Sequence, residues 1–349
     1  MLRNIKKFNS DFGDHSHNNY ISMSDLALDS KFEFIEKYGS ADYMRDQDCY
    51  ICGGNDFKHL NSLDRYGFYY PTGVCKSCGN IQQTKYYDET ATEAFYTDYY
   101  RNIYDQESPT ERFIYQKNVI GENIISFIKD FDFPKSVLEI GCGSGGILKA
   151  FQLKGSKVLG LDYDIRFINE GQNNGVNIRQ GSIEVLDQSE KFECIILNHV
   201  LEHIVEPRLM LKSLKRHLSE NGIIYIEVPS VNSLLMGMYG SDLQQYFQNA
   251  HTIHFTNYSL NNLALSCGYD IQKQDNFIRS IWRESNSNQN VKLSNYYDDS
   301  LFLINATERN RVSTKMKLVR ARNYIRLSIS YILDFFGVKN FLKKALRDN

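Results

Sequence analysis

Residues 137–146, with the sequence VLEIGCGSGG, limit the folds open to this chain more than any other segment. An apolar run leads into four glycines within six residues, and a helical pattern follows from 147 to 153. This order is typical of a buried strand, a tight turn and a helix N-terminus. Glycines are needed where the backbone approaches a ligand closely or takes a positive φ, and the first helical turn offers free N–H groups. A tight turn without a ligand is the alternative.

A second buried strand, residues 157–162, ends in Asp162. This acid lies 21 residues after Gly141, the spacing at which an acid accepts hydrogen bonds from ribose hydroxyls in a nucleotide-binding sheet. With Glu139 two residues before the first glycine, the GxGxG pattern resembles the class I methyltransferases that use S-adenosylmethionine (SAM). An NAD-dependent oxidoreductase is the alternative enzyme, although the dinucleotide motif is GxGxxG.

The resemblance covers about residues 119–306 and implies an α/β fold with a Rossmann-like, seven-stranded class I methyltransferase sheet. It places the glycine turn under the methionine part of SAM, Glu139 near the amino group and Asp162 at the ribose. An acid is usual in this family at the position of Ser182, which can still form hydrogen bonds. The SAM contacts that the resemblance implies are Glu139, Gly141, Cys142, Gly143, Asp162, Tyr163, Ser182, Ile183, Asn198 and His199.

The remaining strands of this sheet are expected at residues 176–180, 192–198, 222–228, 269–277 and 300–306. The fourth strand, 192–198, runs into the sequence HVLEHIVEP, which resembles a box found in a large subgroup of methyltransferases. In that fold, methyl transfer takes place at the carboxyl end of the fourth strand. The resemblance therefore places the acceptor beside this box.

Two CxxC pairs precede the methyltransferase-like region. Cys49 and Cys52 form the first pair, Cys75 and Cys78 the second, and each pair is followed by glycine. Two such turns supply four thiolates for one tetrahedral zinc ion, and a full set of four protein ligands indicates a structural site. Redox-active CxxC pairs are the alternative. We predict a zinc-ribbon-like domain over residues 49–85.

Composition limits the possible partners. The 349 residues carry a formal net charge of −2, so no overall positive field attracts nucleic acid. The ribbon offers Lys58, Arg65 and Lys76 as its cations, which is too thin a basic patch for nucleic-acid binding. No apolar signal core or membrane-length run is present, and unpaired cysteines fit a reducing compartment, so we expect a cytoplasmic protein. A binding module on a SAM-fold scaffold is the non-enzymatic alternative.

Three segments flank these domains. Residues 1–48 are polar and show no chemistry, and residues 86–118 are a tyrosine-rich helical connector that either packs between the domains or covers the site. Residues 307–349 form a basic tail, with eleven Lys and Arg against two Asp from 309 onward. Its apolar residues recur at helical spacing. We expect a helical extension that packs on the protein or on a second subunit, or that touches an anionic membrane surface.

Methyl transfer often requires a base, and histidine titrates near the working pH. We place His251 first as the catalytic residue, His203 of the VLEH box second and His254 as a further candidate. The chain resembles bacterial sugar methyltransferases, some with an N-terminal zinc-binding domain, in which a Glu-His pair follows the fifth strand. Ala250 stands in place of that Glu. The missing Glu favours O-methylation over carbon deprotonation.

The predicted function is therefore SAM-dependent O-methylation within residues 119–306. The expected acceptor is a small molecule, either a sugar, a nucleotide-linked sugar or another precursor of a surface polysaccharide. A sugar C-methyltransferase, or a methyltransferase of another small metabolite, is the alternative.

Overall fold

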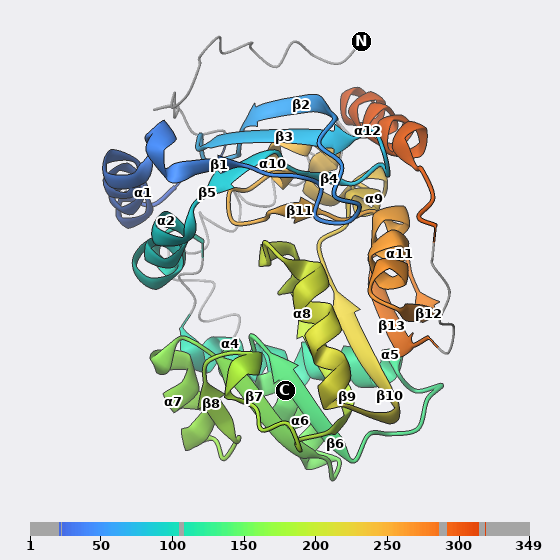
Figure 1. The fold of residues 1–349 in the computed structure, drawn as a ribbon. Helices are drawn as coiled ribbons and strands as arrows, with labels where there is room; N and C mark the ends of the chain where they lie inside the picture. The colour runs from blue at the N-terminus through green and yellow to red at the C-terminus, as the bar shows by residue number, and fades with distance from the viewer. Residues whose placement is uncertain (1–20, 22, 105–107, 286–291, 314–317, 319–349) are drawn as a thin grey trace.

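The structure is a computed structural model that describes residues 21, 23–104, 108–285, 292–313 and 318. Two sheets organise the described residues (Figure 1). A seven-stranded sheet lies in the lower half of the view, and a four-stranded sheet lies in the upper half with helices at both of its ends. Most of the predicted basic tail falls outside the described residues. None of the described helices combines the length and apolar character needed to cross a bilayer.

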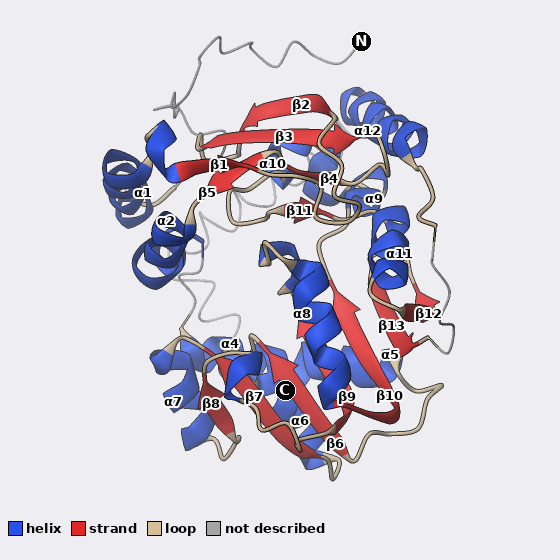
Figure 2. Ribbon diagram, in the orientation of Figure 1, coloured by secondary structure: helices blue, strands red, loops and turns tan. Residues whose placement is uncertain are grey.

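The seven-stranded sheet has the order β12-β13-β10-β9-β6-β7-β8, drawn in red in Figure 2. Its strands are β6 (Ser136–Ile140), β7 (Lys157–Asp162), β8 (Ile178–Gln180), β9 (Phe192–Asn198), β10 (Leu218–Glu227), β12 (Tyr269–Gln274) and β13 (Arg279–Glu284). The strands from β10 to β8 are parallel, and β13 is antiparallel to both of its neighbours. This arrangement confirms the predicted class I methyltransferase sheet.

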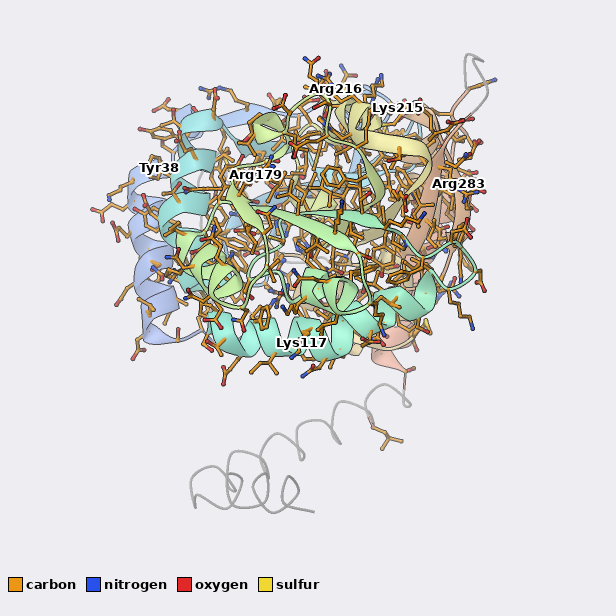
Figure 3. The ribbon with its side chains drawn as sticks, turned by 90° about the horizontal axis from the view of Figure 1, so that it is seen from below. Tyr38, Lys117, Arg179, Lys215, Arg216 and Arg283 are labelled. Atoms are coloured by element: carbon orange, nitrogen blue, oxygen red, sulfur yellow. The ribbon has the colours of Figure 1, made fainter. Side chains whose placement is uncertain are left out.

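Helices cover both faces of this sheet, which explains why its central strands are apolar on both sides. One face is covered by α4 (Pro109–Tyr115), the π-helical turn η3 (Gln116–Ile120), α5 (Gly121–Phe127), α6 (Gly146–Leu153) and α7 (Ile165–Asn173). The other face is covered by α8 (Pro207–Leu214) and α11 (Asn257–Ser266). Figure 3 shows the two layers from below, with Lys117 of η3 on one side and Lys215, just after α8, on the other.

The predicted seventh strand, residues 300–306, is wrong. These residues lie in helix α12 (Tyr297–Val312), and the seventh strand is β13, which the sequence analysis did not identify. The buried positions of α12 include Ser300, Leu303, Ile304 and Thr307, a spacing of three and four that fits a helix and not a strand. α12 packs against α9 (Val231–Leu235) and β3, and so it belongs to the upper half of the molecule.

The upper sheet has the order β11-β4-β3-β2. Three strands come from the cysteine-containing region: β2 (Phe57–Leu63), β3 (Tyr69–Cys75) and β4 (Ile81–Gln83). The fourth, β11 (Ile253–His254), comes from the segment after β10 and pairs antiparallel with β4. The predicted zinc-ribbon region therefore does not form its sheet alone. The loop that carries the candidate histidines is part of the same sheet.

The remaining elements surround this upper half. They are α1 (Asp25–Tyr38), η1 (Ala41–Tyr43), the pair β1 (Met44–Asp46) and β5 (Lys85–Tyr87), α2 (Glu89–Ala94), the π-helical η2 (Phe95–Tyr99) and α3 (Tyr100–Tyr104). Short helices η7 (Met238–Ser241) and α10 (Leu243–Tyr246) precede β11. Phe34 of α1 is fully buried and packs edge-on against Tyr87, Phe95 and Tyr99. The tyrosine-rich connector is therefore helical, as predicted, and is anchored in an aromatic cluster.

Candidate active site

A cavity of about 440 Å³ opens at the carboxyl ends of β6, β7 and β9, where ligands bind in open parallel sheets. Its walls come from both halves of the molecule. The lining residues with polar side chains or glycine backbone are Tyr96, Tyr100, Arg101, Arg112, Gln116, Gly141, Gly143, Asp162, Tyr163, Gly181, Ser182, Asn198, His199, Glu202, His203, Tyr239, Gln248 and His251. Seven of the ten predicted SAM contacts line it, together with His203 and His251.

The glycine turn has the shape that the sequence predicts. Gly141 and Gly145 have φ values of 66° and 70°, which residues with a side chain rarely adopt. A Cβ atom on Gly141 would lie 2.7 Å from Cγ2 of Val200, so the turn and the segment after β9 fit together only without a side chain here. The turn leaves Gly141 and Gly143 lining the cavity.

We expect Gly141→Ala to weaken SAM binding at least tenfold. The left-handed conformation costs an alanine about 1–2 kcal/mol, and Val200 must also move. Gly155→Ala is the matched control, because Gly155 also has a positive φ, of 100°, but a Cβ atom added there would meet no heavy atom within 4 Å. Calorimetric titration with SAM checks the prediction. Equal SAM affinities for the wild type and Gly141→Ala would contradict it.

Asp162 ends β7 and holds the glycine turn in place. Its Oδ2 accepts a hydrogen bond of 2.7 Å from the Gly143 N–H, and its Oδ1 accepts one of 2.9 Å from the Asp164 N–H. Each carboxylate oxygen can accept a further bond. The residue therefore supports the turn and also faces the cavity, where the resemblance places the ribose.

An acid that sequence reasoning missed lies next to Ser182, outside the cavity lining. Ser182 stands where the family usually has an acid, but the Ser182 N–H donates to Glu184 Oε1 at 2.8 Å. The Tyr163 hydroxyl donates to the same oxygen at 3.3 Å. Glu184 therefore brings a carboxylate close to Ser182 from two residues further along. Its position in the short helix η4 (Ile183–Val185), directly after β8, was the available signal.

Three predicted SAM contacts do not line the cavity. The side chain of Cys142 is fully buried in the core between the sheet and its helices, and Ile183 packs against the core of the opposite face. Glu139 lies within β6, 1% exposed, and its Oε2 has no hydrogen-bond partner among the described residues. Burial and the nearby Asp162 raise the pKa of Glu139 well above its usual value, although Arg112 opposes this.

The unpartnered atoms fit a polar ligand such as SAM. Asn198, at the end of β9, also has a buried Oδ1 without a partner in the described part of the chain. Together with the Asp162 carboxylate, Asn198 would give acceptors for polar groups of this cofactor, and Glu139 lies buried behind the glycine turn without lining the cavity. The residues present therefore fit the cofactor that the resemblance implies.

His251 and His203 meet in the part of the cavity where the segment after β10 approaches the end of β9. Their rings are 4.9 Å apart between centroids and nearly perpendicular. Burial, with His203 and His254 nearby, lowers the pKa of His251 well below its usual value. Burial also lowers the pKa of His203, although Glu202 opposes this. Both imidazoles are therefore neutral near pH 7.

Glu202 stands between these histidines and supplies the carboxylate that Ala250 lacks. Its Oε1 is 3.9 Å from His203 Nε2 and 4.0 Å from His251 Nε2. His199 Nδ1 lies 3.4 Å from the same oxygen. Position 250 has no acid, as the sequence shows, but Glu202 approaches His251 in space. The partner comes from the VLEH box, about fifty residues earlier, and not from the neighbouring position in sequence.

His254 does not line the cavity. Its ring is fully buried on β11, where Nε2 makes a close contact with the Tyr70 hydroxyl. Burial lowers the pKa of His254 to about 3. His254 is therefore a buried residue of the upper sheet and does not contact the cavity.

The tyrosine-rich connector forms the roof of the cavity. Tyr96 and Tyr100 line it, and the Tyr96 hydroxyl donates to the Ala250 carbonyl at 3.1 Å. Arg101 Nε pairs with Asp164 Oδ2 at 3.2 Å, which joins α3 to the start of α7. Sequence reasoning left a lid and a packing helix equally open. The structure shows that this segment both packs and covers the site.

The four cysteines lie together at one end of the upper sheet. Their sulfur atoms lie within 4.8 Å of one another, with Cys49 Sγ 3.5 Å from Cys78 Sγ and Cys52 Sγ 3.5 Å from Cys75 Sγ. Zn–S bonds of about 2.3 Å would place tetrahedral sulfurs about 3.8 Å apart. The cluster therefore has the composition and size of a four-thiolate zinc site.

Comparisons with known proteins agree with this geometry. Residues 113–274 match a family model described as a methyltransferase domain. A ubiquinone biosynthesis O-methyltransferase of Glaesserella parasuis is 33% identical over 106 residues, which cover 27% of this chain and 45% of that protein. One of the same description from Bradyrhizobium diazoefficiens is 26% identical over 28% of this chain and 40% of its own length. The chain thus spans less than half the length of these curated relatives.

Solved structures with similar chain traces include a SAM-dependent methyltransferase from Clostridium acetobutylicum. It has 14% identity and a TM-score of 0.41, and the match covers 50% of this chain and 98% of that one. A magnesium protoporphyrin IX methyltransferase from Synechocystis, with bound S-adenosylhomocysteine, has 17% identity and a TM-score of 0.39 over 56% of this chain and 98% of its own. Residues 113–274 thus match a methyltransferase domain in sequence, and the seven-stranded sheet has the class I methyltransferase fold.

Proposed function

We propose that this protein transfers a methyl group from SAM to a hydroxyl group of a sugar or a nucleotide-linked sugar. The observation that carries the proposal is that one cavity is lined by the glycine turn and Asp162 and also by Glu202 and His251. The first pair is suited to hold SAM, and the second is suited to act on an acceptor proton. The match to O-methyltransferases supports the reaction type.

SAM supplies an already activated methyl group, so the chain must align the acceptor oxygen and deal with its proton. His251 faces the cavity and is neutral, as a proton acceptor must be. Glu202 lies 4.0 Å from its Nε2 and would stabilise the imidazolium that forms. The roof residues Tyr96 and Tyr100 limit access of water. We therefore assign the role of general base to His251 in a mechanism without a metal ion.

A second cavity of about 440 Å³ supports a phosphate-bearing acceptor. It shares Arg112, Asn198 and His199 with the first cavity and adds Arg279. One guanidinium group can donate two hydrogen bonds to two oxygens of the same phosphate. Arg279 also pairs with Asp275 at 2.7 Å, and Glu227 lines the same cavity, so an anion would compete with these carboxylates. The two arginines favour a nucleotide-linked sugar over a free sugar.

Calorimetric titration of the purified protein with SAM and with NAD tests the donor. We expect SAM to bind and Asp162→Ala to lose about 1.5–3 kcal/mol of binding free energy, the range for a hydrogen bond to a charged group. Asp162→Asn is the matched variant, because it keeps the shape and one acceptor. Tighter binding of NAD than of SAM would refute the proposal, and unchanged SAM affinity in Asp162→Ala would remove Asp162 from the site.

We also propose that Cys49, Cys52, Cys75 and Cys78 bind one structural zinc ion. The support is the cluster of four sulfurs, which leaves no ligand position for a substrate.

A further inference from the structure

Glu202 is a buried carboxylate whose ion-pair partners among the described residues are all histidines. Its side chain is 1% exposed, and neither carboxylate oxygen has a hydrogen-bond donor among the described residues. The closest polar groups are the imidazole nitrogens of His199, His203 and His251, at 3.4–4.0 Å. A buried carboxylate is costly unless it is paired, hydrogen-bonded or bound to a metal.

The tautomer of His203 leaves a nitrogen lone pair directed at this carboxylate. His203 Nδ1 lies 2.9 Å from the Ala250 carbonyl, which can only accept, so Nδ1 carries the proton. Nε2 is then unprotonated and faces Glu202. A histidine that donates one N–H to a backbone carbonyl and offers its other nitrogen is the usual form of a metal ligand.

Backbone hydrogen bonds hold the cluster in shape. The Glu202 carbonyl accepts from the Thr252 N–H at 2.8 Å and from the Thr252 hydroxyl at 3.1 Å. The bond from His203 to Ala250 joins the same two segments. These bonds therefore fix the VLEH box to the loop of His251, and the side chains of Glu202, His203 and His251 project from these two joined segments. This rigidity is what a preorganised binding site requires.

We propose that Glu202, His203 and His251 bind one divalent transition-metal ion, of the class of Mn²⁺, Fe²⁺, Co²⁺ or Zn²⁺, at the acceptor end of the cavity. The ligand atoms of the three side chains all lie within 4.8 Å of one another. With bonds of about 2.1 Å, two ligands in a tetrahedral site lie about 3.4 Å apart. An ion would therefore draw Glu202 Oε1 closer to the two histidine nitrogens than the present 3.9 and 4.0 Å. Two histidines and one carboxylate leave coordination positions open.

Binding requires one local change. The side-chain amide of Gln248 makes a close contact with His251 Nε2, the nitrogen that the ion would use. Gln248 also lines the cavity and contacts Arg65, so the ion would displace its amide from His251. The open coordination positions face the cavity and would take an acceptor oxygen. This role rests on the proposed function, and with the ion bound His251 acts as its ligand and not as the general base.

The site can be tested without SAM or acceptor by titrating the zinc-loaded protein with Mn²⁺. The electron paramagnetic resonance signal of free Mn²⁺ measures how much of the ion is bound. Mn²⁺ prefers carboxylate and imidazole ligands to thiolates, so the cysteine cluster does not compete. We expect about one strongly bound Mn²⁺ per chain. Loss of a supporting group around a metal weakens binding 10–100-fold, so Glu202→Gln and His251→Ala should each weaken Mn²⁺ binding at least that much.

His59→Ala is the control variant, because His59 is exposed on β2 and remote in sequence from the cluster. It should bind Mn²⁺ as the wild type does, and circular dichroism should show that all variants are folded. Equal Mn²⁺ affinity in the wild type and in the two cluster variants would overturn the proposal. So would a wild type that binds neither Mn²⁺ nor Co²⁺ beyond its zinc. SAM titration on the same samples keeps this outcome separate from a failure of the proposed function.

Discussion

Replacement of His251 by alanine is expected to lower turnover by about 10²–10⁴, the usual contribution of a general base. His251 is 6% exposed, lines the cavity and lies 4.0 Å from the Glu202 carboxylate, so the variant removes the proposed base without touching the glycine turn. SAM affinity should stay within a few-fold of the wild type. The measurement is the rate of S-adenosylhomocysteine release with a nucleotide-linked sugar as acceptor, beside calorimetric titration with SAM.

The other histidines provide the comparison for this experiment. His254→Gln should affect stability more than turnover, because His254 contacts Tyr70 inside the upper sheet and does not line the cavity. The exposed His59→Ala should leave turnover unchanged. If His251→Ala turned over within a few-fold of the wild type and His203→Ala did not, the role of base would pass to His203. Dependence of the wild-type rate on added Mn²⁺ would instead indicate that His251 acts as a metal ligand.

The glycine turn and its contact with Asp162 could be predicted because their signals are local in sequence. The order of strand, glycine turn and helix around Gly141 fixes the backbone over ten residues, and Asp162 ends the adjacent parallel strand β7. Each prediction depended on neighbours along the chain or across one strand pair. The same reasoning does not give the direction of a side chain. It could not show that the side chain of Cys142 points into the core.

The acceptor half could not be predicted in the same way because it depends on contacts between distant segments. Nothing in the sequence near His251 shows that Glu202 is its acidic partner, since hydrogen bonds between distant segments bring the two together, among them those of Thr252 to the Glu202 carbonyl. The misplaced seventh strand has a related cause. Residues 300–306 are apolar enough for a strand, and only their packing on the upper sheet reveals the helical spacing.

Replacement of Cys75 by serine is expected to release the zinc ion and to destabilise the upper half of the molecule. Four-thiolate sites in small domains contribute apparent binding free energies of about 10–16 kcal/mol to folding. A loss of only about 4 kcal/mol would lower the melting temperature by roughly 8–16 °C at about 2–4 °C per kcal/mol. Metal analysis should give about one zinc per wild-type chain and much less in Cys75→Ser, and thermal unfolding measures the change in stability.

Loss of this zinc should also reduce turnover, because the cysteine sheet positions the loop of His251. The side chain of Gln83, on β4, donates to the carbonyls of Asn249 and His251 at 2.9 and 3.1 Å, and the Gln83 N–H donates to the Thr252 carbonyl at 3.0 Å. Cys267→Ser is the matched control, because Cys267 is also buried but lies in the methyltransferase half. SAM affinity should change less than turnover in Cys75→Ser, since the glycine turn lies on the other sheet. A metal-free wild type that is fully folded would refute the zinc assignment.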